Sequence, residues 1–254
     1  MSLPPAEQPK PVATRADRDR ERHARKIARA ALEQLGFPTS RLRLLHDGQN
    51  TTYRVDAPDG PHALRVTRPG VGLPHVEGEL AWTAALDRDT TLTLCAPQAW
   101  TTVQERVCVM TRWVPGVSRT KSLSASMLRA VGAVMAELHE HGHGWRPPPG
   151  WARPRLETVW LEAPSPLPLL PSPARETFAR CEQRLRPVLA RLFDEPTHVL
   201  HADLHQGNYR FRPGHRVGVI DFDSCAVGHP AQDIAICLYY VLRHPRYARL
   251  RPAF

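Results

Sequence analysis

The stretch from Val199 to Asp223 reads VLHADLHQGNYRFRPGHRVGVIDFD, and the prediction of the fold rests on it. It opens with the pattern H-x-D-x-x-x-x-N, formed by His201, Asp203 and Asn208. Two short apolar runs follow around a turn signal at Pro213-Gly214, so the pattern predicts a loop that leads into a β-hairpin. Polar groups are therefore expected at the ends of strands.

The polar groups of this stretch suit phosphoryl transfer. That chemistry needs one carboxylate to accept or orient the proton of an attacking hydroxyl, while an amide and a second carboxylate hold Mg²⁺ against nucleotide phosphates. Asp203 fits the first role; Asn208 and Asp221 fit the metal roles, because hard oxygen donors suit Mg²⁺. The alternative is that Asp203 and Asn208 are only turn residues. A chance turn would not also place Asp-Phe-Asp after an apolar strand at this distance.

The motif His-x-Asp-Leu-His-x-Gly-Asn, followed by Ile-Asp-Phe-Asp, resembles the catalytic loop and metal-binding aspartate of the aminoglycoside phosphotransferase and choline kinase family. The resemblance implies an α/β (α+β) fold of the bilobal protein-kinase-like type, with a small antiparallel sheet in the first lobe and a mainly helical second lobe. It implies transfer of the γ-phosphate of ATP to a hydroxyl of a small molecule, with Mg²⁺. In the family, the histidine equivalent to His201 braces the loop. No role is assigned to His205 from the sequence.

The resemblance and the local patterns together divide the chain into three parts. Residues 1–13, with four prolines, are expected to be a mobile tail. Residues 14–112 are expected to form a nucleotide-binding lobe that begins with an arginine-rich helix, ended by Gly36-Phe37-Pro38. Three short strands follow, and the turn signal Pro58-Asp59-Gly60 predicts that the last two form a hairpin. Residues 113–254 form the predicted catalytic lobe.

The first lobe should hold the nucleotide phosphates. The segment from Gly48 to Thr52 resembles the phosphate-covering loop of the family, and its backbone amides, together with the Thr51 and Thr52 hydroxyls, could meet phosphate oxygens. Arg65 occupies the strand position where kinases have a lysine; it is either a phosphate ligand or an exposed strand arginine. Its expected partner is Glu79, with Glu77 as the alternative. The resemblance thus implies Gly48, Asn50, Thr51, Thr52, Arg65 and Glu79 as nucleotide-binding residues.

The run from Val107 to Gly116 predicts a strand that enters a turn, and it resembles the hinge between the lobes. Adenine would use the backbone from Thr111 to Trp113, and Met110 and Trp113 would pack nearby. As plain core residues these side chains would look no different.

The second lobe is expected to contain helices over residues 124–141 and 176–192, separated by a segment with nine prolines. Asp233 resembles the family aspartate that begins a helix, and we expect it to cap that helix and hold the catalytic loop through hydrogen bonds. The chain ends 21 residues later. Family members continue through further helices that wall the acceptor site, so part of that region is expected to be missing or supplied by another chain.

Composition bears on the location of the protein, the state of its cysteines and the class of its partner. The chain has 254 residues and no apolar run long enough to span a bilayer, which predicts a cytoplasmic protein without a membrane partner. Its five cysteines lack C-x-x-C spacing and suggest buried thiols in a reducing compartment. Five of the nine excess positive charges fall in one N-terminal segment without interleaved aromatics, so nucleic acid is not the favoured partner. The rival functions are a Ser/Thr protein kinase of the same family and a catalytically weak kinase-like binding protein; the oligomeric state is left open.

Overall fold

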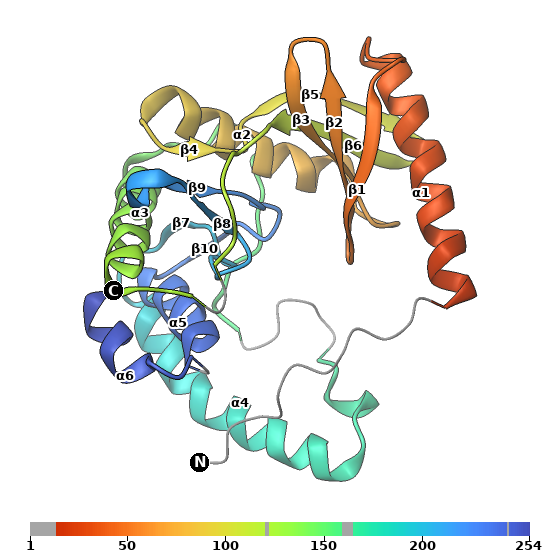
Figure 1. Ribbon diagram of the computed structural model, residues 1–254. Coiled ribbons are helices and arrows are strands. Elements are labelled where there is room, and N and C mark those ends of the chain that lie inside the picture. Colours follow the sequence, from red (N-terminus) through yellow and green to blue (C-terminus); the bar gives the residue numbers. More distant parts are fainter. Residues whose placement is uncertain (1–13, 120–121, 159–164, 243) are drawn as a thin grey trace. The chain divides into compact units, whose positions relative to one another are not determined.

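The computed structural model describes residues 14–119, 122–158, 165–242 and 244–254 (Figure 1). The expected tail at residues 1–13 lies outside the described residues. The chain divides into two compact units. Unit 1 comprises the chain up to Arg88 together with Thr93–Pro115, and unit 2 comprises Asp89–Leu92 and Gly116–Phe254.

Unit 1 is built on an antiparallel sheet with the strand order β1-β2-β3-β6-β5. The strands of this unit are β1 (Arg41–Asp47), β2 (Thr51–Ala57), β3 (Gly60–Val66), β4 (Thr93–Leu94), β5 (Pro97–Val103) and β6 (Arg106–Arg112). The hairpin between β2 and β3 forms as expected: Ala57 pairs with Gly60, whose φ of 127° is open to glycine alone. The same register places Thr52 opposite Arg65, so these two side chains share one face of the sheet.

Helix α1 (Arg15–Gln34) covers one face of this sheet. Its apolar stripe, centred on Ile27 and Leu32, packs in one core cluster with Tyr53, Leu64 and Met110 of the strands. Helix α2 (Leu73–Asp89) packs on β6 in a separate cluster. Each helix is therefore held by the burial of its apolar residues, the dominant favourable term in folding.

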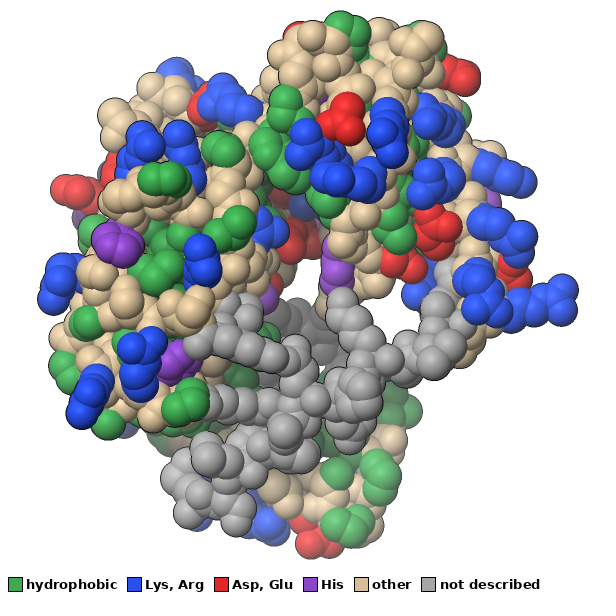
Figure 2. Space-filling model, viewed as in Figure 1, with side chains coloured by type: hydrophobic (Ala, Val, Ile, Leu, Met, Phe, Trp, Pro, Cys, Tyr) green, Lys and Arg blue, Asp and Glu red, His purple; other side chains and the backbone are tan. Residues whose placement is uncertain are grey.

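The outward face of α1 is basic, and Lys and Arg side chains gather over it in Figure 2. Several of these cations have acidic partners: Arg20 pairs with Asp47, Arg22 with Asp19 and Arg25 with Glu21. These pairs reduce the charge that the face presents to a partner.

Unit 2 is mainly helical, with two small pairs of strands. Its elements are α3 (Ala125–Gly144), η1 (Leu167–Leu169), α4 (Ser172–Phe193), β7 (His198–Leu200), β8 (Tyr209–Phe211), η2 (Pro213–His215), β9 (Val217–Val219), β10 (Ala226–Gly228), α5 (Pro230–Val241), α6 (Tyr247–Leu250) and η3 (Arg251–Ala253). Strand β7 pairs with β10, and β8 pairs with β9. The β8–β9 hairpin turns where Gly214 adopts a φ of 75°.

Helix α3 lies directly against β7, and its ends are marked in the sequence. The Ser124 side chain accepts the backbone N–H of Met127 and caps the start of the helix. Near the other end, a Cβ on Gly142 would lie 2.2 Å from the carbonyl oxygen of Val199. Only glycine allows this approach, which places the strand leading into the His201–Asn208 loop against the helix.

Helix α4 differs from the others because none of its residues, all of which are described, is buried. Phe178, Leu185 and Val188 are exposed along it. Cys181 is exposed as well, and Cys95 in unit 1 is only partly buried, so the expectation of five buried thiols was wrong at these two positions.

Among the described residues, no helix is both long enough and apolar enough to cross a membrane.

Candidate functional site

Asp233 fixes the backbone of the loop that follows β7. Its carboxylate accepts the backbone N–H of His201 at 3.2 Å and that of Ala202 at 2.7 Å, and it lies 3.0 Å from Nε2 of His139 on α3. The side chain is fully buried. The expected role in holding the loop is therefore present, whereas the expected capping role was wrong: His229 caps α5, in a capping box with Gln232, and Asp233 lies in the first turn. A buried carboxylate needs such partners, because an unpaired one is costly.

His201 braces the same loop from inside. Its Nδ1 accepts the backbone N–H of Asp203 at 3.3 Å, and its Nε2 lies 3.1 Å from the carbonyl oxygen of Ile220. These two bonds require a proton on Nε2 and none on Nδ1. Burial lowers the pKa of His201, which keeps the ring in that neutral form.

Asp203 and Asn208 form one hydrogen-bonded unit. Nδ2 of Asn208 donates to the backbone carbonyl of Asp203 and to Oδ2 of its carboxylate, both at 3.0 Å. Burial, and next the negative charge of Asp223, raises the pKa of Asp203 from 3.8 to about 6, although the Asn208 bond acts in the opposite direction. Since a general base works best with a pKa near the operating pH, Asp203 is suited to accept a proton.

Asn208 and Asp221 lie at the same end of the β8–β9 hairpin. Tyr209 pairs with Val219, and the backbone N–H of Ile220 donates to the carbonyl of Asn208 at 2.9 Å. The amide nitrogen of Asn208 faces Asp203, which turns its oxygen the other way. Asp221 is exposed and has a φ of 70°, a conformation that aspartate tolerates better than most residues. An amide oxygen beside a carboxylate is a donor set that fits Mg²⁺, which takes few protein ligands when phosphates complete its shell.

Arg153 is a site residue that sequence reasoning missed. Its guanidinium donates to the carbonyl oxygen of Cys225 at 2.6 Å and to that of Asp223. It is buried, and it pins the turn that carries Asp223 close enough to affect Asp203. Its partners lie about seventy positions away in the sequence and are backbone atoms, so no motif marks it.

In unit 1, Arg65 pairs with Glu79. The guanidinium lies 2.5 Å from Oε2 of Glu79, with only 11% of the Arg65 side chain and 6% of the Glu79 side chain exposed. Glu77 is exposed. The reading of Arg65 as a solvent-facing arginine is therefore wrong, and the partner is Glu79 rather than Glu77.

The predicted phosphate loop has a defined internal structure. The backbone N–H of Gly48 donates to the carbonyl of Asn50 at 3.1 Å, and Oδ1 of Asn50 accepts the backbone N–H of Arg68 at 3.0 Å. The Thr51 hydroxyl donates to Oδ1 of Asp47 at 2.9 Å, and Thr51 is buried. That hydroxyl is already engaged within the lobe, whereas Thr52 is only partly buried and shares a sheet face with Arg65.

The predicted hinge residues lie at the end of β6. Met110 is buried in the core cluster beneath α1, so its side chain contributes to that core. Thr111 pairs with Ala63, and the Trp113 ring packs under the guanidinium of Arg54, whose Cζ is 4.8 Å from the ring centroid. The indole is thus held by a cation–π contact.

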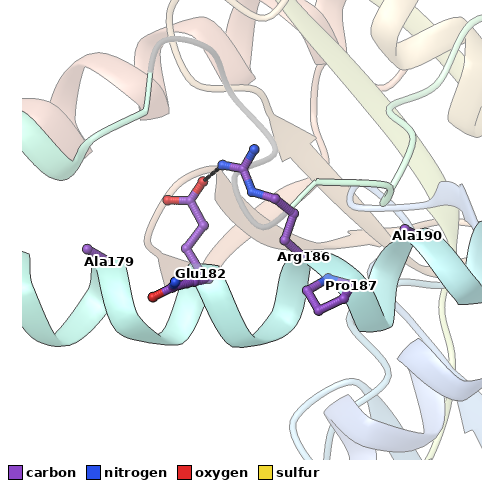
Figure 3. Close-up of a pocket in the computed structure, with 6 residues that line it drawn as sticks. Ala179, Glu182, Arg186, Pro187 and Ala190 are labelled. Atoms are coloured by element: carbon purple, nitrogen blue, oxygen red, sulfur yellow. Dashed lines mark hydrogen bonds and ion pairs between the residues drawn. The ribbon is translucent and has the colours of Figure 1, made fainter.

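A shallow hollow along α4 is lined by Ala179, Glu182, Gln183, Arg186, Pro187 and Ala190 (Figure 3). All six residues come from one helix, and Glu182 and Arg186 are joined by an ion pair at 2.7 Å. None of the predicted site residues contributes to it.

The geometry of the loop and hairpin agrees with a comparison against protein families. A model described as "Phosphotransferase enzyme family" matches residues 40–254. The chain belongs to this family. The match includes every predicted site residue, from Gly48 to Asp221.

Solved structures share the fold of this family member. An amicoumacin kinase superposes with a TM-score of 0.67 at 21% identity, over 80% of this chain and 65% of its own. A microcompartment-associated aminopropanol kinase superposes with a TM-score of 0.63 at 24% identity, over 85% of this chain and 74% of its own. An aminoglycoside phosphotransferase from Streptomyces rimosus superposes with a TM-score of 0.61 at 20% identity, over 87% of this chain and 86% of its own. The expected protein-kinase-like α/β fold is confirmed.

An uncharacterized protein from Deinococcus radiodurans is 28% identical over 226 residues, which cover 83% of this chain and 65% of that protein. The chain therefore spans about two thirds of the length of this relative and of the amicoumacin kinase.

Proposed function

We propose that this family member transfers the γ-phosphate of ATP to a hydroxyl group of a small molecule, with Mg²⁺. The observation that carries the proposal is the Asp203–Asn208 unit, in which a partly buried carboxylate has a pKa raised to about 6. A carboxylate with that pKa accepts a proton near neutral pH and still holds it only weakly. The fold alone would not support this assignment, because function must be argued from the site.

The proposed step begins with the acceptor hydroxyl beside Asp203. Its oxygen forms a bond to the γ-phosphorus, the bond from that phosphorus to the β–γ bridging oxygen breaks, and the hydroxyl proton passes to the Asp203 carboxylate. Asn208 keeps the carboxylate in place through its 3.0 Å bond to Oδ2. When bound, Mg²⁺ supplies positive charge that neutralises the phosphate oxygens. Asn208 and Asp221 are the residues proposed to hold it.

Unit 1 is proposed to hold the nucleotide. Arg65, steadied by Glu79, would contact the α- and β-phosphates through its guanidinium. Gly48, Asn50 and Thr52 would cover the phosphates, while Thr51 stabilises the loop through Asp47. The backbone of Thr111 to Trp113 would bind the adenine.

A small alcohol is the proposed acceptor. The solved relatives include kinases described as acting on amicoumacin and aminopropanol, and an aminoglycoside phosphotransferase in complex with ADP and streptomycin. A protein acceptor is the rival. A kinase-like protein that only binds is less favoured, because Arg65 and Glu79 form an ion pair at the position where protein kinases have their lysine–glutamate pair. We propose a cytoplasmic location as well, because the proposed activity depends on ATP.

The test is acceptor-dependent release of ADP. The protein would be incubated with ATP and Mg²⁺ against 1-amino-2-propanol, streptomycin, hygromycin B, amino acids and protein substrates, with Asp203→Asn as the matched control. Asp203→Asn keeps the shape and should lower kcat by about 10²-fold or more, with ATP binding little changed. Near-wild-type turnover by Asp203→Asn would remove the catalytic assignment, and ADP release only with a protein acceptor would support the rival.

A further inference from the structure

His205 lies inside the proposed catalytic loop and has no assigned role. Its backbone N–H donates to the carbonyl of Asp203 and its carbonyl accepts the N–H of Asn208, both at 2.8 Å. Its Nδ1 accepts the backbone N–H of Gly207 at 2.9 Å. A Cβ on Gly207 would lie 2.6 Å from Cε1 of this ring, so the glycine lets the ring lie close to the backbone. The imidazole is therefore held in one orientation.

That orientation directs one ring atom at the catalytic carboxylate. Because Nδ1 accepts a hydrogen bond, the proton of the neutral ring must be on Nε2. Nε2 lies 3.6 Å from Oδ2 of Asp203. This is too long for a hydrogen bond, although contacts of this kind shorten when substrate binds. The ring therefore points an N–H at the carboxylate.

Tyr240, from α5, stacks on one face of the His205 ring. The two rings stack with centroids 4.3 Å apart and planes 27° apart, and Tyr239 meets Tyr240 edge-on at 5.5 Å. Tyr240 is 40% exposed and Tyr239 is 60% exposed. His205, Tyr239 and Tyr240 therefore form an open aromatic wall that starts beside Asp203. The negative charge of Asp203 reaches Tyr240, because it helps burial to raise the pKa of that phenol.

We propose that His205, clamped by Tyr240, is a positioning residue that keeps the Asp203 carboxylate turned toward the acceptor, and that Tyr240 is the surface on which the acceptor rests. The proposal rests on the proposed function. Asn208 already binds Oδ2 from one side, and the His205 N–H limits rotation of the same oxygen from another. The Asn208 hydrogen bond and the nearby His205 N–H together restrict the direction of the carboxylate, and small misplacements of a reacting group lower the rate strongly.

Two substitutions of His205 separate this role from a purely structural one. The amide nitrogen of Gln can stand where Nε2 stands, so His205→Gln keeps a donor toward Asp203 and loses the acceptor for Gly207. The amide oxygen of Asn can stand where Nδ1 stands, so His205→Asn keeps that acceptor and loses the donor. Positioning of Asp203 predicts that Gln is the better replacement, whereas bracing of the loop predicts Asn.

The probe is Mg-ATP with water as the acceptor, followed by phosphate release, so that no identified alcohol is required. We expect His205→Asn to lower kcat about tenfold or more and His205→Gln to lose about threefold, with KM for ATP unchanged in both. Equal thermal unfolding midpoints of the two variants would exclude a folding effect. The reverse order of the two kcat values, or equal losses, would overturn the positioning role. A wild type that binds Mg-ATP and releases no ADP, either with water alone or with the alcohols above, would instead remove the proposed function.

Tyr240 supplies the second arm. Tyr240→Phe keeps the stacked ring and removes only the hydroxyl, so it should change kcat and KM less than Tyr240→Leu, which should lower kcat and raise KM for an alcohol from the panel. In nitrogen NMR spectra, His205 should show the proton on Nε2 in the wild type and in Tyr240→Phe, and a mixture of ring forms in Tyr240→Leu. A ring protonated on Nδ1 in the wild type would contradict the proposal whatever the activity.

Discussion

Ala202 occupies a backbone conformation that alanine disfavours. Its φ is 62°, in the left-handed region, where a Cβ approaches the following carbonyl at a cost of about 1–2 kcal/mol. The bond from its N–H to Asp233 holds it there, one residue before Asp203. We expect Ala202→Gly to raise the free energy of unfolding by about 0.5–1 kcal/mol, since relief of strain exceeds the added freedom of the unfolded chain. Urea unfolding measures the change. Ala231→Gly, inside α5, should instead destabilise, and a loss of stability in both variants would contradict the prediction.

Arg65 and Glu79 are a second test at the scale of single residues. Because both side chains are nearly buried, Arg65→Met leaves an unpaired carboxylate and should cost about 3 kcal/mol or more, whereas Arg65→Lys keeps the pair. The double variant Arg65→Met/Glu79→Gln removes both charges and should recover most of the stability. Its kcat/KM for ATP should stay low, because the proposed phosphate contact is gone. A double variant that regains both stability and kcat/KM would restrict Arg65 to a structural role.

At the scale of elements, the loop from His201 to Asn208, proposed to be catalytic, is held between α3 and α5 by one carboxylate. Asp233 serves two backbone N–H groups and His139. Asparagine has one oxygen and one NH₂ group, so Asp233→Asn must leave at least one buried donor unsatisfied, at about 1–3 kcal/mol. We expect lower thermal stability together with a fall in kcat that exceeds any change in nucleotide affinity. Asp194→Asn, at an exposed site, is the control. Unchanged kcat in Asp233→Asn would show that the loop keeps its geometry without this anchor.

The elements differ in how far the sequence predicts them. The helix predicted over residues 124–141 forms at Ala125–Gly144, because its periodicity and its serine cap are both local. Strand β5 was not predicted, since Pro97–Val103 has little apolar alternation and gains its stability from pairing with β6. The prediction for Asp233 was right about holding the loop and wrong about capping the helix. Capping is set by local sequence, and Pro230 at the first position of α5 could have shown that the helix starts before Asp233. Arg153 was out of reach, because its partners are distant carbonyls.

At the scale of the whole molecule, the family motifs gave the fold class because Asp203, Asn208 and Asp221 occur in one order around one hairpin. They could not give the contacts that tune this site. The raised pKa of Asp203 depends first on burial and next on Asp223, a residue placed by tertiary packing. The sequence likewise could not show that Tyr240 reaches back from α5 to stack on His205. Contacts between side chains of separate elements are set by tertiary packing, which no local sequence pattern specifies.

Two groups of unit 2 should give the stability of the molecule opposite responses to acid. Burial lowers the pKa of His198 from 6.5 to about 4, with smaller contributions from His139, His143 and His229, and neither ring nitrogen has a partner among the described residues. Below pH 6.5 the unfolded chain therefore takes up a proton that the folded chain refuses, so His198 destabilises the fold as the pH falls toward 4. Asp203 has its folded pKa raised from 3.8 to about 6, so the folded chain holds the proton more tightly and the fold gains stability as the pH falls through 6.

Single substitutions should expose each response. His198→Phe removes the acid-sensitive ring and two buried unsatisfied nitrogens, so it should raise the free energy of unfolding at pH 7.5 by about 1 kcal/mol and by more at pH 5. Asp203→Asn removes the buried charge; it should stabilise the metal-free protein at pH 7.5 and lose that advantage at pH 4.5. Urea midpoints measured in EDTA at each pH supply the comparison, with His23→Gln, at an exposed position of α1, as the control. Parallel curves for wild type and His198→Phe between pH 7.5 and pH 5 would mean that the His198 ring already reaches solvent and takes up its proton in the folded state.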